Sequence, residues 1–140
     1  MNIKNFKIFF IVFSLGGFLF SGYMSGVKLF SKTCAFGESC PLFLGMPACY
    51  IGFILFASIF ILSIIFAMNK AEEKIISKKI LAISFLGVVY SLNFAIPELP
   101  LLFKNGMKSY MLGLPTCVLG SIFFIILFIA SILLRKKIRN

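Results

Sequence analysis

Four cysteines are the residues of this chain whose types and spacing can do chemistry. Two of them stand in a repeat, because the segment LGMPACYIG at 44–52 returns 68 residues later as LGLPTCVLG at 112–120. The shared Gly, Pro, Cys and Gly indicate an internal duplication that places Cys49 and Cys117 at equivalent positions. Thiolates are nucleophiles and ligands for soft metals. The candidate chemistries are therefore thiol–disulfide exchange and the binding of a thiophilic metal.

Each repeated cysteine follows a Gly-x-Pro sequence at the start of a long apolar run. Pro47 and Pro115 suit the first position of a helix, where the missing amide hydrogen removes a donor that has no partner anyway. Cys49 and Cys117 then fall at the third helical position. There, unpaired backbone amides and the positive end of the helix dipole stabilise a thiolate. The alternative is that Gly-Pro is an ordinary helix start and that both cysteines only pack.

The elements that position these cysteines are membrane spans. A hydrophobic fraction of 61%, a mean hydropathy of +1.09 and a charged fraction of 13% exclude a soluble globular domain. Runs poor in charge that approach roughly 20 residues predict transmembrane helices. We predict an all-α integral membrane four-helix bundle, a single domain over 1–140, with the first span kept as an anchor and not removed as a signal. The predicted spans are about 8–27, 43–67, 80–96 and 112–134.

The duplicated unit is a pair of spans, with halves at about 1–69 and 70–140. Because each half crosses twice, the halves have the same orientation and are related by an axis along the membrane normal. Both cysteine motifs then lie on one membrane face. Outside the motif the match is limited, with Tyr23 and Tyr90 near corresponding points of the first and third spans. Small residues are expected to let helices approach closely, at a GxxxG pattern in the first span and at the repeated motif glycines. These are Gly22 and Gly26, Gly45 and Gly52, and Gly113 and Gly120.

Lysine and arginine fall unevenly around the predicted spans, and the excess sets the expected orientation. Positively charged segments stay on the cytoplasmic side, so both termini are expected to be cytoplasmic and the cysteines to lie outside. The membrane is expected to be a bacterial or archaeal cytoplasmic membrane. The net charge of +10 is expected to attract anionic lipid head groups. Nucleic acid is not an expected partner, because the basic residues flank spans without interleaved aromatics. Ten of the 14 basic residues lie on the predicted inner side: Lys4, Lys7, Lys70, Lys74, Lys78, Lys79, Arg135, Lys136, Lys137 and Arg139.

Two further cysteines, Cys34 and Cys40, lie in the first of two predicted outer loops, at 28–42 and 97–111. They bracket the sequence AFGES and can close a small disulfide ring around Gly37. The outer compartment permits disulfides. The pair is either a structural staple for the loop or a redox pair that exchanges with a thiolate at a helix start. Four cysteines allow three complete pairings.

This layout resembles the vitamin K epoxide reductase and disulfide bond formation protein B family of membrane thiol oxidoreductases. The resemblance covers the four spans, the pair Cys34 and Cys40 after the first span, and the segment FLGMPACYIGFILF opening the second. It implies electron transfer from a thioredoxin-like thiol partner on the outer side, through the loop pair, to a quinone. The family's quinone-facing site is a Cys-x-x-Cys at the outer start of the last helix, where this chain has LPTC. Cys117 matches the second cysteine, but Leu114 stands at the first. Cys117 then needs another partner, which is either Cys49 or, through an interloop disulfide, Cys40.

Other residue types limit the remaining functions. The chain has no histidine, which excludes imidazole acid–base chemistry and histidine-containing metal sites, and no metal site is predicted. Glu98 in IPELP and Glu38 are interpreted as exposed loop carboxylates in preference to proton relays. The rival functions are a noncatalytic membrane protein with a structural Cys34–Cys40 disulfide and, less favoured, a transporter of thiophilic metal.

Overall fold

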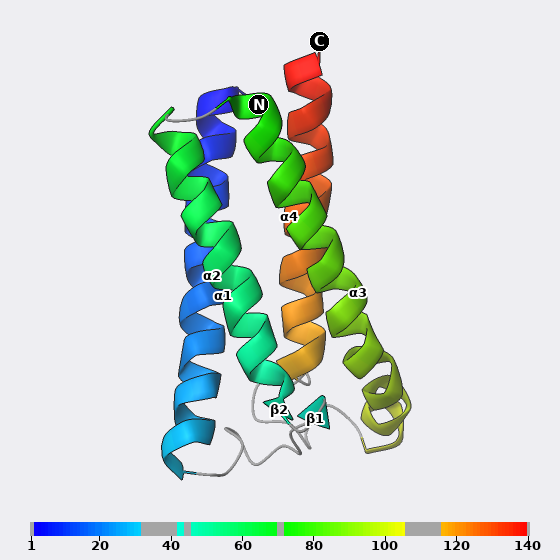
Figure 1. Cartoon of the computed structure of the whole chain (residues 1–140). Coiled ribbons are helices and arrows are strands. Elements are labelled where there is room, and N and C mark those ends of the chain that lie inside the picture. Colours follow the sequence, from blue (N-terminus) through cyan, green and yellow to red (C-terminus); the bar gives the residue numbers. More distant parts are fainter. Residues whose placement is uncertain (1, 32–41, 44–45, 70–71, 106–115, 140) are drawn as a thin grey trace.

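Four helices form one bundle in the computed structural model, which describes residues 2–31, 42–43, 46–69, 72–105 and 116–139. They are α1 (Ile3–Ser31), α2 (Ala48–Ala67), α3 (Glu73–Asn105) and α4 (Thr116–Arg139). All four are long and apolar enough to cross a membrane. Successive helices run in opposite directions, and the N and C labels lie at the same end of the bundle (Figure 1). The predicted all-α membrane four-helix bundle is confirmed.

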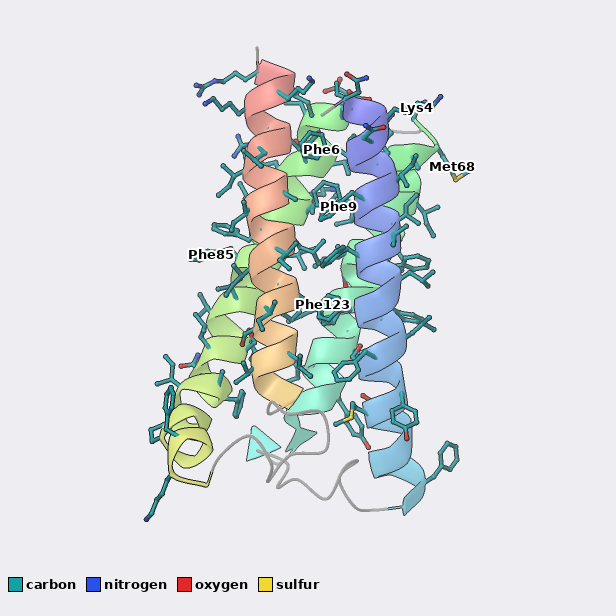
Figure 2. The ribbon with its side chains drawn as sticks, turned by 180° about the vertical axis from the view of Figure 1, so that it is seen from behind. Lys4, Phe6, Phe9, Met68, Phe85 and Phe123 are labelled. Carbon is teal, nitrogen blue, oxygen red and sulfur yellow. The ribbon has the colours of Figure 1, made fainter. Side chains whose placement is uncertain are left out.

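Packing follows the two halves of the duplication. The most extensive contacts join α1 to α2 and α3 to α4, so each half folds as an antiparallel helical pair. Contacts of α2 with α3 and of α1 with α4 complete the ring, which leaves α2 and α4 diagonally opposed. Figure 2 shows Phe9 and Phe123 in the space between α1 and α4, whereas Phe85 points away from the bundle. Among the residues whose side chains the structure describes, five phenylalanines are buried in the core: Phe6, Phe10, Phe56, Phe66 and Phe124.

A short hairpin precedes α2 and corrects the predicted start of the second span. Strand β1 (Leu42–Phe43) pairs antiparallel with β2 (Met46–Pro47), so that Leu42 lies opposite Pro47. The predicted span began at 43, whereas α2 begins at Ala48. Pro47 therefore stands just before the helix and not at its first position. A proline is compatible with this place because a two-stranded ribbon has only edge strands, and an edge strand tolerates a missing donor.

Helix α3 is longer than the sequence predicts. The third span was expected to end at 96 and to be followed by a loop at 97–111, but α3 continues through Pro97 and Pro100 to Asn105. The prediction that IPELP, including Glu98, forms a loop is therefore wrong, because the backbone of this segment is helical. Each proline removes one hydrogen bond from the helix, and membrane helices accommodate such losses without ending.

Lys7 joins three elements at the end of the bundle that carries the termini. Its Nζ lies 3.0 Å from Oε1 of Glu73 at the start of α3, and the Lys7 side chain is only 15% exposed. The same ammonium donates a hydrogen bond to Oδ1 of Asn69 and lies 5.0 Å from the centroid of the Phe66 ring. Asn69 has a φ of 55°, a left-handed conformation that asparagine tolerates. Lys7 thus ties α1 to the connection between the two halves.

Replacing Lys7 with methionine is expected to lower the free energy of unfolding by about 1 kcal/mol, because it removes an ion pair and a cation–π contact that are partly shielded from water. The matched control is Lys4→Met, since Lys4 is exposed on the same helix. The measurement is the SDS fraction that unfolds half of the protein in dodecyl maltoside micelles, followed by near-ultraviolet circular dichroism. Equal midpoints for the two variants would contradict the role given to Lys7.

Candidate redox site

Two of the four cysteines lie at helix starts in the described part of the chain. Cys49 is the second residue of α2 and Cys117 the second residue of α4. This confirms the predicted helix-start placement, one position earlier than expected. Both helices begin at the end of the bundle away from the termini, where β1 and β2 also lie (Figure 1). Cys34 and Cys40 lie outside the described residues.

The cysteine positions share helix faces with two phenylalanines at the centre of the bundle. Phe56 follows Cys49 by seven residues, and Phe124 follows Cys117 by seven residues. Seven residues make two helical turns to within about 20°, so each cysteine position lies on the same face as its phenylalanine. The rings of Phe56 and Phe124 are each 2% exposed and stack with centroids 4.3 Å apart and planes 18° apart. The helix faces that carry the two cysteine positions are therefore directed toward one another across the bundle.

Each ring of this stack also contacts a glycine on a neighbouring helix. A Cβ built on Gly17 of α1 would lie under 3.0 Å from three atoms of the Phe56 ring. A Cβ on Gly87 of α3 would overlap the Phe124 ring in the same way. Gly17, Phe56, Phe124 and Gly87 thus form a chain of contacts that crosses all four helices, which we call the central stack. Its two halves are equivalent, as the duplication requires.

The central stack extends the repeat beyond the cysteine motif. Gly17 and Gly87 each stand in the pattern Ser-x-x-Gly-x-x-x-Ser, which recurs at a distance of 70 residues and is buried at all its named positions. In this register Tyr90 corresponds to Phe20, so the pairing of Tyr23 with Tyr90 suggested by the sequence is displaced by three residues. The pattern was readable in the sequence, because Gly17 with Ser21 and Gly87 with Ser91 are pairs of small residues four apart, a spacing typical of close helix packing in membranes. It was missed because only the Gly-x-x-x-Gly form was considered. The serines of the pattern are Ser14, Ser21, Ser84 and Ser91.

Most buried serines are compatible with a membrane interior here because their hydroxyls bond within their own helices, whereas Ser84 Oγ has no hydrogen-bond partner among the described residues. Ser21 Oγ donates to the carbonyl oxygen of Gly17 at 2.7 Å. Ser63 Oγ and Ser131 Oγ, at equivalent places in α2 and α4, donate to the carbonyl oxygens of Ile59 and Phe128, each at 2.7 Å. Such bonds satisfy the hydroxyl without a partner helix. The small side chains therefore serve close packing around the central stack.

The glycines singled out from the sequence behave differently from Gly17 and Gly87. A Cβ built on Gly26, Gly52 or Gly120 meets no atom within 4 Å among the described residues. One on Gly22 meets only the Phe53 ring, at 3.1 Å. Among these, the expected close approach is found at Gly22 alone, and there it is mild. Gly45 and Gly113 lie outside the described residues.

The hairpin before α2 limits the separation of Cys40 from Cys49, because each cysteine is close in sequence to one of its strands. Leu42, paired with Pro47, comes two residues after Cys40, and Pro47 comes two residues before Cys49. Adjacent α carbons are 3.80 Å apart along the chain. The two cysteines are therefore tethered, each by two residues, to backbone positions that face one another in the hairpin.

An apolar groove is present in the described part of the chain, but far from the cysteine positions. It has a volume of about 490 Å³ and runs between α1 and α4, lined among others by Phe9, Ile126 and Leu133, with Lys137 at its rim. Ile126 is the lining residue of α4 nearest to Cys117 in the sequence, and the nine helical steps from Cys117 to Ile126 rise about 13 Å along the helix. A quinone in this groove would be too distant to react with a thiol of the helix starts.

Comparison of the chain with protein-family models, with curated proteins and with solved structures gives no match. The class of molecule that the fold defines is an integral membrane four-helix bundle made of two parallel repeats. Its function is inferred from the cysteine positions.

Proposed function

We propose that this chain is a membrane thiol–disulfide oxidoreductase coupled to a quinone, of the vitamin K epoxide reductase and disulfide bond formation protein B type. One observation carries the proposal. The positions of Cys49 and Cys117 lie on helix faces that meet through the stacked rings of Phe56 and Phe124. This supports a redox pair formed between the halves, in place of the Cys-x-x-Cys that the family carries within one helix.

The proposed electron path keeps atoms and electrons in balance. A thioredoxin-like dithiol on the outer side attacks the Cys34–Cys40 disulfide, forms a mixed disulfide and leaves as its own disulfide, which transfers two electrons and two protons. The Cys40 thiolate then attacks Cys49 in the disulfide joining Cys49 and Cys117, which forms a Cys40–Cys49 mixed disulfide and releases the Cys117 thiolate. The Cys34 thiolate attacks Cys40 in this mixed disulfide, which regenerates the loop disulfide and releases Cys49. The resulting pair of thiols passes two electrons and two protons to the quinone, which becomes a quinol, and the disulfide between Cys49 and Cys117 re-forms.

The chain tether at the hairpin supports Cys40 as the loop cysteine that reaches Cys49. Leu42 and Pro47 are opposite each other, and each is two residues from one of these cysteines. The alternative route is a direct disulfide between Cys40 and Cys117, and it requires no bond between the diagonal helices. Disulfide formation needs α carbons within roughly 7 Å. Because the hairpin connects Cys40 to the start of α2, it favours Cys49 over Cys117 as the cysteine that Cys40 attacks.

The proposed setting is the cytoplasmic membrane of a bacterium or archaeon, with both termini inside and the cysteines outside. The excess of lysine and arginine at the end that carries the termini supports this orientation. In that orientation the helix starts with Cys49 and Cys117 face the oxidising compartment, where a disulfide persists.

The test is quinone reduction by the purified chain in dodecyl maltoside, with a reduced thioredoxin-like protein as the electron donor and a short-chain ubiquinone as the acceptor. Quinol formation is read from ultraviolet absorbance, with heat-treated protein as the blank. Turnover that requires both donor and protein would support the proposal. Thiol trapping followed by mass spectrometry, run in parallel, should find the bond between Cys49 and Cys117 in the oxidised protein and not in the donor-treated protein.

The rival function makes the opposite prediction in the same experiment. A noncatalytic membrane protein stapled by Cys34–Cys40 would show no quinol formation, a loop disulfide that the donor leaves intact, and free thiols at Cys49 and Cys117. That result would overturn the proposed function. A thiophilic-metal transporter would instead bind copper(I) or zinc stoichiometrically through its thiols.

A further inference from the structure

A basic cavity lies at the end of the bundle that carries the termini, between the start of α3 and the end of α4. Its volume is about 470 Å³. Four cationic side chains line it, together with the hydroxyl-bearing Ser77 and two isoleucines. Figure 2 shows nitrogen-tipped side chains gathered on the last turns of α4. The cationic residues are Lys74 of α3 and Arg135, Lys136 and Arg139 of α4.

The charges of this cavity converge from two helices and are not balanced within it. None of the described residues that line the cavity is acidic. Glu73, beside Lys74 in the sequence, pairs with Lys7 of α1. Ser77 stands one turn after Lys74, on the same face of α3, and its Oγ donates to the Lys74 carbonyl oxygen at 3.0 Å. Guanidinium groups present paired donors that match phosphate oxygens, and lysines add point charges. The cavity therefore has the chemistry of a phosphate site.

The depth of the cavity identifies the source of the phosphate. Along α4 the lining residues run from Ile132 to Arg139, and these seven helical steps rise about 10 Å. The polar layer on one side of a bilayer is roughly 5 to 8 Å thick. The cationic groups then lie at the level of the head groups, while Ile132 reaches the edge of the hydrocarbon. A phospholipid fits this gradient because its phosphate is joined to apolar chains.

We propose that this cavity binds the phosphate of an anionic phospholipid head group. Basic pockets between membrane helices on the cytoplasmic side are a known form of lipid site. The site is separate from the cysteines, which lie at the other end of the bundle, so it stands whether or not the chain has redox activity. Basic residues that only orient the protein would attract anionic lipid over the whole surface at this end of the bundle. The proposed lipid binding is instead confined to the cavity between α3 and α4.

The test titrates the purified full chain in detergent with phosphatidylglycerol and separately with phosphatidylcholine, and counts bound lipid by native mass spectrometry. Wild-type protein is expected to bind phosphatidylglycerol at least about tenfold more tightly. Each lysine that pairs with the bound phosphate is expected to contribute a factor of about five, so Lys74→Gln with Lys136→Gln should weaken phosphatidylglycerol binding about 25-fold. The matched control is Lys4→Gln with Lys78→Gln, two exposed lysines at the same end but outside the cavity. It should change binding less than about twofold.

Three results would overturn the proposal. The first is no preference of the wild-type protein for phosphatidylglycerol, a comparison that needs no variant to fold. The second is equal weakening by the two double variants, which would indicate diffuse surface charge. The third is displacement of the lipid by millimolar glycerol 3-phosphate, which would indicate a site for a free phosphate ester. Retention of the lipid under that challenge, with selective loss in the cavity variant, would support it.

Discussion

Gly87→Ala is expected to lower the free energy of unfolding by about 1 to 2 kcal/mol, although alanine is the better helix former. The added methyl would overlap the Phe124 ring, whose other contact in the central stack is Phe56 at 4.3 Å. Inserting a methyl group into a tight core costs about 1 to 3 kcal/mol. The gain in helix propensity from glycine to alanine offsets up to about 1 kcal/mol of this cost. Gly17→Ala should behave alike, because its overlap with Phe56 is equivalent.

The matched control for this effect is Gly120→Ala. Gly120 is also helical, but a Cβ built there meets no described atom within 4 Å. The same substitution should leave stability unchanged or raise it slightly. The difference between the two variants, about 2 kcal/mol, is roughly a 30-fold change in the folding equilibrium. It is measured as the shift of the SDS unfolding midpoint in dodecyl maltoside, followed by near-ultraviolet circular dichroism.

A second substitution tests whether the ring is the cause. Phe124→Leu removes the rigid ring, so the cost of Gly87→Ala should fall in that background, and the two changes should not be additive. If Gly87→Ala and Gly120→Ala shift the midpoint equally, or if the costs add without interaction, the central stack does not determine the packing of the four helices.

The central stack also shows why the sequence predicted the number of helices better than their contacts. Four apolar runs in the sequence predict four membrane spans, because a helix that crosses a bilayer needs roughly 20 apolar residues. Which glycines allow close approach depends on how each helix is rotated. The familiar GxxxG pattern drew attention to Gly22 and Gly26, whereas the close approaches occur at Gly17 and Gly87.

Other differences have equally physical causes. Prolines at 97 and 100 suggested a loop, yet the helical bonds around them carry α3 on to Asn105. The ion pair of Lys7 with Glu73 joins residues far apart in the sequence and has no local signal. For the candidate site, the sequence correctly placed Cys49 and Cys117 at helix starts, because proline and an apolar run mark a helix start locally. That these cysteine positions share helix faces with two stacked rings, Phe56 and Phe124, could be seen only from the arrangement of the diagonally opposed α2 and α4.

If the proposed path holds, Cys117→Ser is expected to reduce thiol-driven quinone reduction at least about 1000-fold, because in that path the Cys117 sulfur forms and breaks a disulfide in every cycle. Cys49→Ser should cost as much as Cys117→Ser, and the double variant should be no worse than either one. Residues that act as a unit lose their shared function once, so their effects do not add. Serine differs from cysteine by one atom, and the SDS unfolding midpoint of each variant serves as the control for folding.

The pattern of losses decides between the two electron paths. In the path through both helix starts, Cys49→Ser and Cys117→Ser are equally inactive, and in Cys49→Ser the donor still opens the Cys34–Cys40 disulfide without producing quinol. In the direct path, Cys117→Ser is inactive but Cys49→Ser retains most of the wild-type rate. Activity that survives in both variants would remove the helix-start cysteines from the reaction altogether. The faces of α2 and α4 that meet at Phe56 and Phe124 favour the first of these outcomes.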